Sequence, residues 1–334
     1  MTAPIVHGGG ITEAAAAFGG KPEDWLDLST GINPNPVRLP DIDVQAWHRL
    51  PDRHLVDSAR HAAARYYRSS DILPLPVPGT QSVIQLLPRL VAPGRRIAIF
   101  APTYGEYARA FASAGFAIDE VSSADQLTPD HGLAILVNPN NPTGRAFASE
   151  DVVGMAQRMQ AHGGLLLVDE AFGDTAPHLS VAGQTAGHGN LIVFRSFGKF
   201  FGLAGLRLGF VIAPELVLSA FQEWLGPWAV SGPALVVAAK LMGEDTQAVQ
   251  SLILSRSEGL GAVLRQAGLT IIGGTPLFTL VDHARAADLH AHLCQQRVLT
   301  RKFAYAPSWL RIGLAPDAAG DTRLADALRS AHLV

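Results

Sequence analysis

Short apolar runs alternate with helical patterns through the first two thirds of the chain. Helical spacing of apolar residues predicts helices at 57–68, 81–91 and 105–114. Apolar runs without that spacing predict strands, which we place at 96–101, 132–138, 164–169, 191–195 and 208–213. Short buried strands separated by helices are typical of a mostly parallel sheet covered on both faces. The pattern therefore predicts a large α/β domain.

The pattern changes after residue 214. Helical stretches cover 215–224 and 233–267, followed by strand-like runs and one more helix, at 270–272, 277–281, 310–314 and 286–294. These elements predict a smaller α+β domain. The opening of the chain is rich in Gly, Pro and Asn, which indicates an arm with little regular structure. We expect the arm over 1–53, the large domain over 54–230 and the small domain over 231–334.

Composition narrows the function classes. The chain has 334 residues, is 48% hydrophobic and carries a formal charge of −3, which gives no attraction to nucleic acid or anionic membranes. No apolar run approaches the ~20 residues that span a bilayer, and the first residues have neither the basic start nor the apolar core of a secretion signal, so we expect none. The 12 His show no metal-site spacing, and a single cysteine, Cys294, permits no internal disulfide. We expect a cytoplasmic globular protein without metal, nucleic-acid or membrane partners.

Pro-Gly-Thr-Gln at 78–81 precedes a helical pattern. Free N–H groups at a helix N-terminus favour a phosphate, and a glycine such as Gly79 lets the anion approach closely. The alternative is an N-cap without a ligand.

Asn-Pro-Asn-Asn-Pro-Thr-Gly at 138–144 directly follows a predicted strand. Such a cluster is usually a turn. In an open α/β sheet, however, ligands bind in the loops at the carboxyl ends of strands, where Asn141 could donate a hydrogen bond.

Leu-Leu-Leu-Val-Asp-Glu at 165–170 places Asp169 at the carboxyl end of a buried strand. A buried carboxylate is costly unless it is paired, and a protonated ring nitrogen is one suitable partner. A helix cap or a structural salt bridge is the alternative.

Lys199 lies in an almost uncharged stretch rich in Gly and Phe, at 194–207. If it is buried, its pKa falls, which makes it a candidate for Schiff-base chemistry. Ser196 and Arg207 could hold a phosphate, the arginine through a bidentate contact. The alternative is a surface loop with one solvated lysine. Together the four motifs provide the groups needed to hold pyridoxal phosphate (PLP).

With these motifs, the sequence resembles the aspartate-aminotransferase fold family of PLP enzymes, in its histidinol-phosphate aminotransferase-like branch, from about residue 7 to 315. The resemblance implies the PLP-dependent transferase fold, which is α/β with a mostly parallel sheet and a small α+β domain. It implies that Lys199 carries the cofactor, that Asp169 pairs with the ring nitrogen and that Asn141 contacts the ring oxygen. Tyr104 would stack on the ring, and Arg311 would bind the substrate α-carboxylate. The cofactor phosphate would be bound by Gly79, Thr80, Gln81, Ser196 and Arg207.

The arm distinguishes a group within this branch. His-Gly-Gly at 7–9 and Trp-Leu-Asp-Leu-Ser-Thr-Gly-Ile-Asn-Pro at 25–34 resemble the threonine-phosphate decarboxylases of cobalamin biosynthesis. Those enzymes turn L-threonine O-3-phosphate into (R)-1-amino-2-propanol phosphate. The resemblance implies a small phosphorylated amino acid as substrate and a homodimer with the site at the subunit interface. Candidate substrate contacts besides Arg311 are His7, Gly9, Thr30 and Asn141.

Two positions depart from the aminotransferase pattern: Phe172 and Leu50 stand where tyrosines are usual. The missing hydroxyl at Phe172 leaves more of the contact with the ring oxygen to Asn141, and Leu50 puts an intersubunit phosphate contact in doubt. Both favour the decarboxylase slightly. An aminotransferase acting on histidinol phosphate or a related amino acid shares every cofactor residue and stays the main alternative. A PLP-binding regulator would need a basic DNA-binding module, for which we expect no room.

Overall fold

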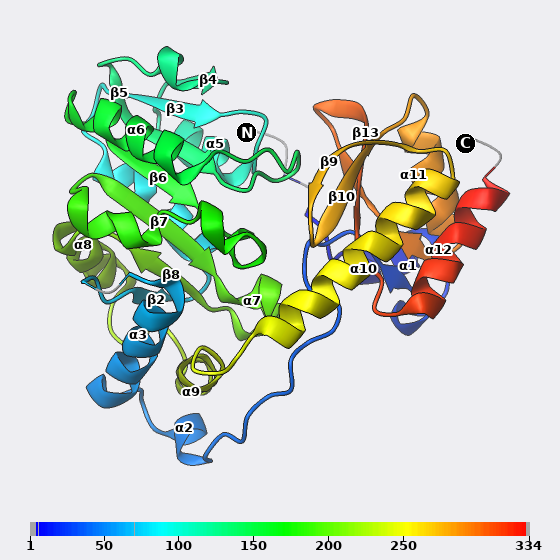
Figure 1. Cartoon of the computed structure of the whole chain (residues 1–334), viewed down its shortest axis with the longest axis horizontal. Helices are drawn as coiled ribbons and strands as arrows, with labels where there is room; N and C mark the ends of the chain where they lie inside the picture. Colours follow the sequence, from blue (N-terminus) through cyan, green and yellow to red (C-terminus); the bar gives the residue numbers. More distant parts are fainter. Residues whose placement is uncertain (1–4, 6, 70, 332–334) are drawn as a thin grey trace.

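The structure, a computed structural model, describes residues 5, 7–69 and 71–331. These residues form three β-sheets, one of only two strands, and the two larger sheets lie next to each other in Figure 1. The larger sheet has seven strands and the smaller one has four. No helix in the described part of the chain is long and apolar enough to cross a membrane.

The larger sheet has the strand order β2-β8-β7-β6-β5-β3-β4. Strands β4, β3, β5, β6 and β7 run parallel to one another, and β8 is antiparallel to both β7 and β2. The predicted mostly parallel sheet is therefore confirmed. The strands are β2 (Leu75–Val77), β3 (Arg96–Phe100), β4 (Ile118–Val121), β5 (His131–Val137), β6 (Leu165–Asp169), β7 (Leu191–Ser196) and β8 (Gly209–Ile212).

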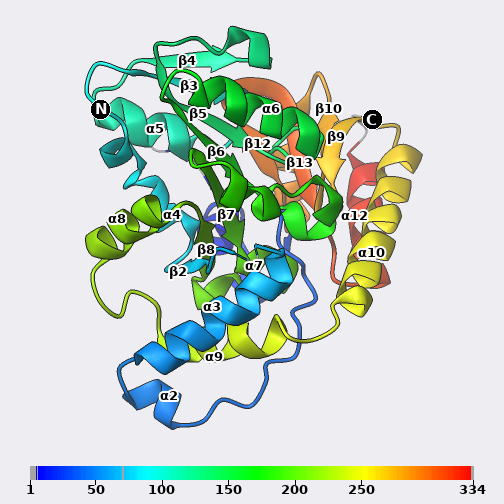
Figure 2. The same cartoon turned by 60° about the vertical axis from the view of Figure 1, so that its left-hand side comes forward.

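Helices cover both faces of this sheet because the side chains of a strand alternate between its faces. In β5, Ala134 and Leu136 pack into one apolar cluster, whereas Leu133, Ile135 and Val137 pack into the other. The first cluster includes α3 (Arg53–Tyr67), α6 (Ser149–Gln160) and α9 (Gly232–Leu241), and the second includes α4 (Thr80–Ile84), α5 (Glu106–Ser113) and α8 (Glu215–Leu225). Figure 2 shows the sheet between these two layers.

The smaller sheet is antiparallel, with the order β12-β13-β10-β9. Its strands are β9 (Thr270–Thr275), β10 (Phe278–Asp282), β12 (Arg301–Phe303) and β13 (Ala306–Gly313). Three helices accompany it in Figure 1, namely α10 (Gln247–Gln266), α11 (Ala286–Gln295) and α12 (Ala318–Ser330). This arrangement matches the expected small α+β region, although the exact boundary near residue 230 stays a prediction.

The prediction of an arm with little regular structure is wrong in part. The arm contains α1 (Ile11–Phe18), β1 (Leu26–Asp27) and α2 (Gln45–His48). Strand β1 pairs in parallel with β11 (Val298–Leu299), so the start of the chain is attached to its last third. Trp25 is buried there in a small cluster with Cys294 and Leu299. A two-residue strand is too short to show a periodicity, and its partner strand is far away in sequence. No local sequence pattern therefore predicts β1.

Two predicted helices are also interrupted. The 81–91 helix is wrong as a single element, because α4 ends at Ile84 and a 3₁₀ turn containing Pro88 follows. The 233–267 stretch is two helices, since α9 ends at Leu241 and α10 begins at Gln247. Elements that the apolar pattern did not predict include α6, α12 and the short strands β2, β4 and β12.

Candidate active site

One cavity of about 1410 Å³ lies between the larger sheet, the smaller sheet and the arm. Its walls include the loops after β3 and β5, the carboxyl ends of β6 and β7, and the start of α4. The structure brings every site residue expected from the sequence to this cavity, namely His7, Gly9, Thr30, Gly79, Thr80, Gln81, Tyr104, Asn141, Asp169, Ser196, Lys199, Arg207 and Arg311.

One end of the cavity is lined by groups of the kind that bind a phosphate. Gly79 has a φ of +75°, and a Cβ at this position would lie 2.9 Å from Nη2 of Arg207. The positive φ favours glycine here, and the missing side chain leaves room for the guanidinium beside the backbone. The hydroxyl of Ser196 and the first residue of α4, Thr80, line the same end. A guanidinium, a hydroxyl and an open backbone turn are suitable ligands for a phosphate dianion.

Asp169 lies at the carboxyl end of β6 and is buried. Its Oδ1 accepts a hydrogen bond from the Ala171 N–H at 2.9 Å, and its Oδ2 accepts one from the hydroxyl of Tyr107 at 2.8 Å. Burial raises the pKa of this carboxyl, while the charge of Lys199 and the Tyr107 hydrogen bond oppose the increase. A cationic ring nitrogen would stabilise the ionised form. The sequence analysis did not identify Tyr107, which is the second residue of α5 and has the sequence pattern of an ordinary core residue.

Lys199 lies in α7 (Phe197–Phe200) and lines the cavity. Its Nζ is 3.5 Å from Oγ of Ser196 and 5.2 Å from the centre of the Phe172 ring. Burial lowers the pKa of the amine, and the charge of Asp169 acts in the opposite direction. A lowered pKa leaves more of the neutral amine, which is the nucleophilic form. Because Lys199 is only partly exposed and lines the cavity from a helix, it is not a solvated lysine in a surface loop.

Asn141 and Arg311 are in direct contact. Nη1 of Arg311 donates to Oδ1 of Asn141 at 2.6 Å, and Nη2 donates to the carbonyl oxygen of Ser29 at 2.8 Å. Burial, followed by the charge of Arg301, lowers the pKa of Arg311 to about 10. The guanidinium is still a cation at neutral pH.

Arg301 is a site residue that sequence reasoning missed. It lies on β12 directly opposite Arg311 on β13, and both line the cavity. The Nε atoms of both arginines are buried, and neither has a hydrogen-bond partner among the described residues. Like charges on facing strand positions repel each other, and an anion between them would relieve the repulsion. A strand of three residues has no pattern, so only the Arg-Lys pair at 301–302 could have suggested it.

The arm contributes the rim of the cavity. Nε2 of His7 is 2.9 Å from Oε1 of Glu106, and the N–H of Gly9 donates to Oγ of Ser29 at 2.7 Å. Thr30 lines the cavity next to them. Leu50, by contrast, is 66% exposed and lies outside the cavity of its own chain.

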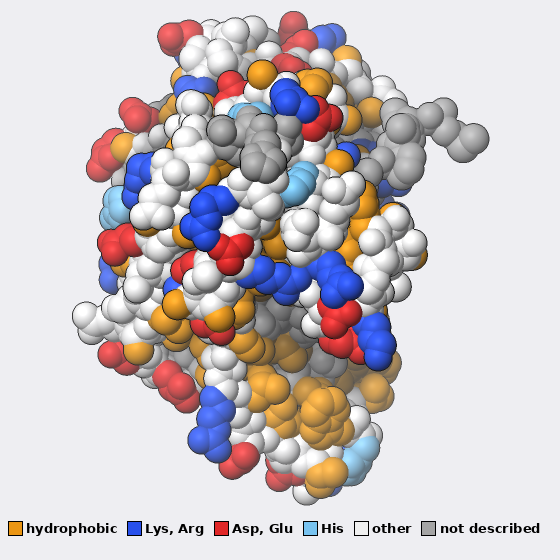
Figure 3. Space-filling view, turned by 90° about the vertical axis from the view of Figure 1, so that its right-hand side faces the viewer, with side chains coloured by type: hydrophobic (Ala, Val, Ile, Leu, Met, Phe, Trp, Pro, Cys, Tyr) orange, Lys and Arg blue, Asp and Glu red, His pale blue; other side chains and the backbone are white. Residues whose placement is uncertain are grey.

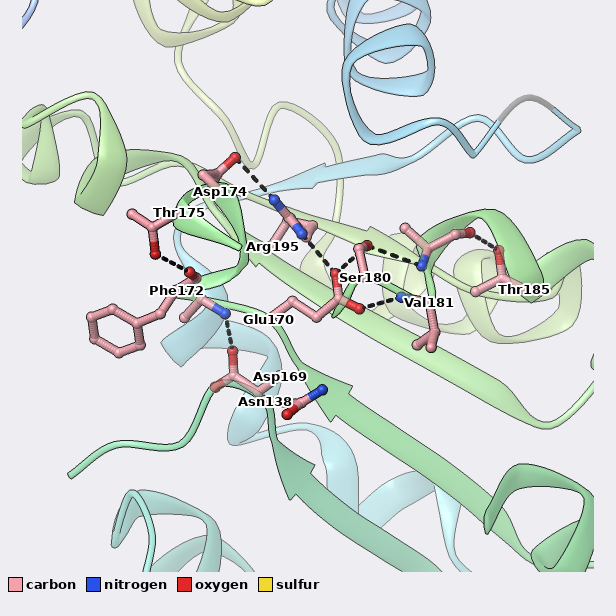
Figure 4. A network of polar contacts seen from close by, with 12 residues as sticks. Asn138, Asp169, Glu170, Phe172, Asp174, Thr175, Ser180, Val181, Thr185 and Arg195 are labelled. Atoms are coloured by element: carbon pink, nitrogen blue, oxygen red, sulfur yellow. Dashed lines mark hydrogen bonds and ion pairs between the residues drawn. The ribbon is translucent and has the colours of Figure 1, made fainter. Parts of the chain in front are cut away.

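A buried ion-pair network supports the turn that follows Asp169 (Figure 4). Arg195 on β7 donates to Oε2 of Glu170 at 2.6 Å and to Oδ1 of Asp174 at 2.9 Å. Ser180 Oγ and the Val181 N–H also donate to Glu170, at 2.5 and 2.7 Å. The network joins the turn that carries Phe172 to the strand that carries Ser196.

The cavity fits PLP. The cradle at Gly79 and Arg207 suits its phosphate, buried Asp169 suits a protonated ring nitrogen, and Lys199 supplies an amine with a lowered pKa. Among the described residues, no cluster of three or more His, Cys, Asp or Glu side chains could hold a metal ion.

Comparisons with known proteins place the chain in a family. The family model for class I and II aminotransferases matches residues 23–328. A threonine-phosphate decarboxylase from Sinorhizobium sp. is 68% identical over 333 residues, which cover 100% of both chains. One from Pseudomonas aeruginosa is 44% identical over 97% of both chains. A similar solved structure is that of a histidinol-phosphate aminotransferase from Sinorhizobium meliloti in complex with pyridoxal-5'-phosphate. The comparison has a TM-score of 0.81 and 21% sequence identity, and it covers 98% of this chain and 96% of the other. The two proteins therefore share the same fold. The chain therefore belongs to the class I and II aminotransferase family and, within it, to the threonine-phosphate decarboxylases.

Proposed function

We propose that this protein uses PLP to decarboxylate L-threonine O-3-phosphate to (R)-1-amino-2-propanol phosphate, a step of cobalamin biosynthesis. The observation that carries the proposal is the 68% identity to a threonine-phosphate decarboxylase along the full length of both chains. The site is consistent with it, because the cavity combines a lysine and an aspartate suited to PLP with buried Arg311 and partly exposed Arg301. A substrate with a carboxylate and a phosphate has two anionic groups for those arginines to bind.

PLP, when bound, supplies an electron sink for the pair left on the substrate Cα after a bond to it breaks. The residues of this chain decide which bond that is by orienting the substrate. We assign the α-carboxylate to Arg311, as the family resemblance implies, and the phosphate to Arg301, whose Nε has no partner among the described residues. His7 and Thr30 lie at the rim, where they can complete the phosphate site. Binding both ends of the substrate fixes its rotation, which uses remote binding energy to select the reaction.

Lys199 is the residue placed to move the proton. When the bond between Cα and the carboxylate carbon breaks, CO₂ leaves and Cα must gain a proton. Nζ of Lys199 lines the cavity, and its lowered pKa helps it to release a proton and to recover one from solvent. The Tyr107 hydroxyl and the Ala171 N–H hold the Asp169 carboxyl in place, where it would pair with the cofactor ring nitrogen.

The direct test mixes PLP-loaded protein with L-threonine O-3-phosphate and no keto acid, and follows CO₂ release together with cofactor absorbance. We expect many turnovers of CO₂ release with the PLP spectrum restored at the end. Conversion of the cofactor to pyridoxamine phosphate without CO₂ would instead establish an aminotransferase. The Lys199→Ala variant should lose about 10³-fold or more in rate. Lys240→Ala is the matched control, since Lys240 does not line the cavity.

The two arginine assignments can be separated with partial ligands. Arg301→Gln should weaken competitive inhibition by 1-amino-2-propanol phosphate, which has no carboxylate. Arg311→Gln should weaken inhibition by L-threonine, which has no phosphate. The reverse pattern would exchange the two roles without affecting the proposed reaction.

We propose further that two copies of the chain associate. Apolar side chains are exposed on and around α2, among them Val44, Trp47 and Leu50, and both Trp47 and Leu50 are 66% exposed. Figure 3 shows hydrophobic side chains gathered at the end of the molecule where Figure 1 places α2. Contiguous exposed apolar side chains are typical of an interface. A homodimer also matches the expectation from the family.

Light scattering coupled to size exclusion tests this association. We expect a dimer for the native chain and a monomer for Trp47→Glu. Leu216→Glu, which alters an apolar side chain that is 85% exposed on α8, should leave the dimer intact. A monomeric native chain at micromolar concentration would contradict the proposal.

We also propose that the protein works in the cytoplasm. Its single cysteine, Cys294, is buried, and burial raises the pKa of the thiol to about 11, so the residue suits a reducing compartment and has no structural need for an oxidising one. Cell fractionation tests this directly.

A further inference from the structure

A buried carboxylate next to the cavity contacts His7 and Gln81 directly and reaches Tyr104 through Gln81. Glu106 is the first residue of α5, and its side chain is only 5% exposed. Oε1 accepts a hydrogen bond from Nε2 of His7 at 2.9 Å, and Oε2 accepts one from Nε2 of Gln81 at 3.1 Å. Oε1 of Gln81 in turn accepts from the hydroxyl of Tyr104 at 3.0 Å. One carboxylate thus connects the arm, the start of α4 and the loop after β3.

The chemistry of Glu106 fixes the direction of each hydrogen bond in this network. An ionised carboxylate can only accept. Gln81 must therefore turn its amide nitrogen toward Glu106 and its carbonyl oxygen toward Tyr104, and the Tyr104 hydroxyl must donate. The ring expected to stack on the cofactor is consequently held by a hydrogen bond whose direction Glu106 determines.

The same reasoning applies to the arm. His7 must donate from Nε2, which leaves Nδ1 as the ring nitrogen available to a ligand. The side chain of His7 is 46% exposed and lines the cavity, so without Glu106 little would hold the imidazole in one orientation. Arg109 reaches the same carboxylate from the surface, with Nη1 at 3.5 Å from Oε1. This cation helps to offset the cost of burying the charge.

We propose that Glu106 is a positioning residue with two branches. Through His7 it orients the arm toward the phosphate end of the substrate, and through Gln81 it orients Tyr104 against the cofactor ring. Glu106 itself does not line the cavity. The first branch rests on the proposed function, since it assumes a phosphorylated substrate, whereas the second requires only that PLP binds.

The test is Glu106→Gln, which keeps the shape but replaces one acceptor oxygen by a donor. The new amide can accept from His7 or from Gln81, but not from both. For the PLP-loaded variant we expect the KM for L-threonine O-3-phosphate to rise about tenfold with kcat within about twofold. For the apoprotein we expect the Kd of PLP, measured by absorbance titration, to rise about fivefold. Glu120→Gln, an exposed carboxylate on β4, is the matched control and should change neither quantity.

Double-mutant cycles separate the two branches. In a His7→Ala background, Glu106→Gln should raise KM no further but should still weaken PLP binding. In a Tyr104→Phe background, the effect on PLP binding should disappear while the effect on KM persists. A merely structural role would lower the melting temperature and would give effects that multiply in both backgrounds. Effects that multiply, or a KM and a PLP Kd both within about twofold of the native values, would overturn the proposal.

The test remains informative if the proposed function fails or if the Glu106→Gln variant does not fold. If the native protein releases no CO₂ from L-threonine O-3-phosphate, the proposed function fails, but the PLP titrations and the Tyr104→Phe cycle still decide the role of Glu106. If Glu106→Gln does not fold, Glu106→Asp keeps the charge and withdraws the carboxylate by one methylene. The same rise in KM and PLP Kd is then expected, and native values would overturn the proposal.

Discussion

Arg311 on β13 donates a 2.6 Å hydrogen bond to Oδ1 of Asn141 in the loop after β5, so the smaller sheet and the larger sheet meet inside the cavity. Because Oδ1 of Asn141 is occupied as an acceptor, its amide nitrogen is the part left to face a ligand. A donor is what the ring oxygen of PLP requires. Arg311, to which we assign the substrate carboxylate, thereby fixes the orientation of Asn141, the residue expected to contact the cofactor.

Replacing Asn141 tests this link. Asn141→Ala removes both the donor to the ring and the acceptor for a buried cation, each a hydrogen bond to a charged partner. We expect kcat/KM for decarboxylation to fall about 10- to 100-fold, corresponding to roughly 1.5–3 kcal/mol. Asn141→Asp keeps the acceptor for Arg311 and loses the donor, so it should weaken PLP binding more than substrate binding. An Asn141→Ala enzyme with native kcat/KM would show that the contact has no role in the reaction.

Asp169→Asn should shift the titration of Lys199. Burial lowers the pKa of Lys199, and the charge of Asp169 raises it. Removing that charge leaves burial less opposed, so the pKa of the amine should fall further and the neutral amine should persist to lower pH. The measurement is the pH dependence of covalent PLP attachment to the apoprotein, trapped by borohydride and read by mass spectrometry.

The midpoint should move to lower pH in Asp169→Asn and stay unchanged in Asp119→Asn, whose carboxyl pairs with Arg96 and His131. A midpoint that moves to higher pH would contradict the electrostatic account. Asp169→Asn should also lose about 10²-fold or more in kcat, because an amide does not hold the ring nitrogen of PLP in its protonated form.

The central sheet and the residues that line the cavity, such as Asp169 and Lys199, could be predicted because both leave local signals. Strands β5 and β6 read as continuous apolar runs since they are buried on both faces, and Asp169 and Lys199 stand out as charges in apolar surroundings. Charge and burial conflict at these positions, and such conflicts mark functional sites.

The residues that could not be predicted depend on contacts between distant parts of the chain. Arg301 lies on a strand of three residues, and its importance appears only when β12 pairs with β13 and places it opposite Arg311. Glu106 reads as a helix-start carboxylate, because its partners Gln81 and His7 come from other elements. Strand β1 finds its partner β11 more than half the chain away. Periodicity contains no information on pairings of this kind.

The Arg195 network should be essential for stability. Asp174→Ala leaves Arg195 with Glu170 as its remaining ion-pair partner in a fully buried setting. Breaking a buried pair in this way costs about 3–5 kcal/mol, which denaturant unfolding of the apoprotein can measure. The exposed pair between Arg285 and Asp288 offers a control, since Asp288→Ala should cost less than about 1 kcal/mol. Equal losses from the two variants would mean that burial does not strengthen the network.

Gly31 is a position close to Lys199 where no larger side chain fits without moving an aromatic ring. A Cβ at this position would lie 2.9 Å from the rings of both Phe172 and Phe278, which pack edge to face with their centres 5.1 Å apart. Gly31→Ala must therefore displace an aromatic ring, at a cost of roughly 1–3 kcal/mol in unfolding free energy. Because the Phe172 ring centre lies 5.2 Å from Nζ of Lys199, the same displacement should lower kcat as well as stability.

Gly154→Ala is the opposite control, because no heavy atom lies within 4 Å of the added Cβ. This variant should stabilise helix α6 by up to about 1 kcal/mol. Urea unfolding and steady-state kinetics on the two variants check both effects, and a Gly31→Ala protein as stable and active as the native one would show that the rings can move apart freely.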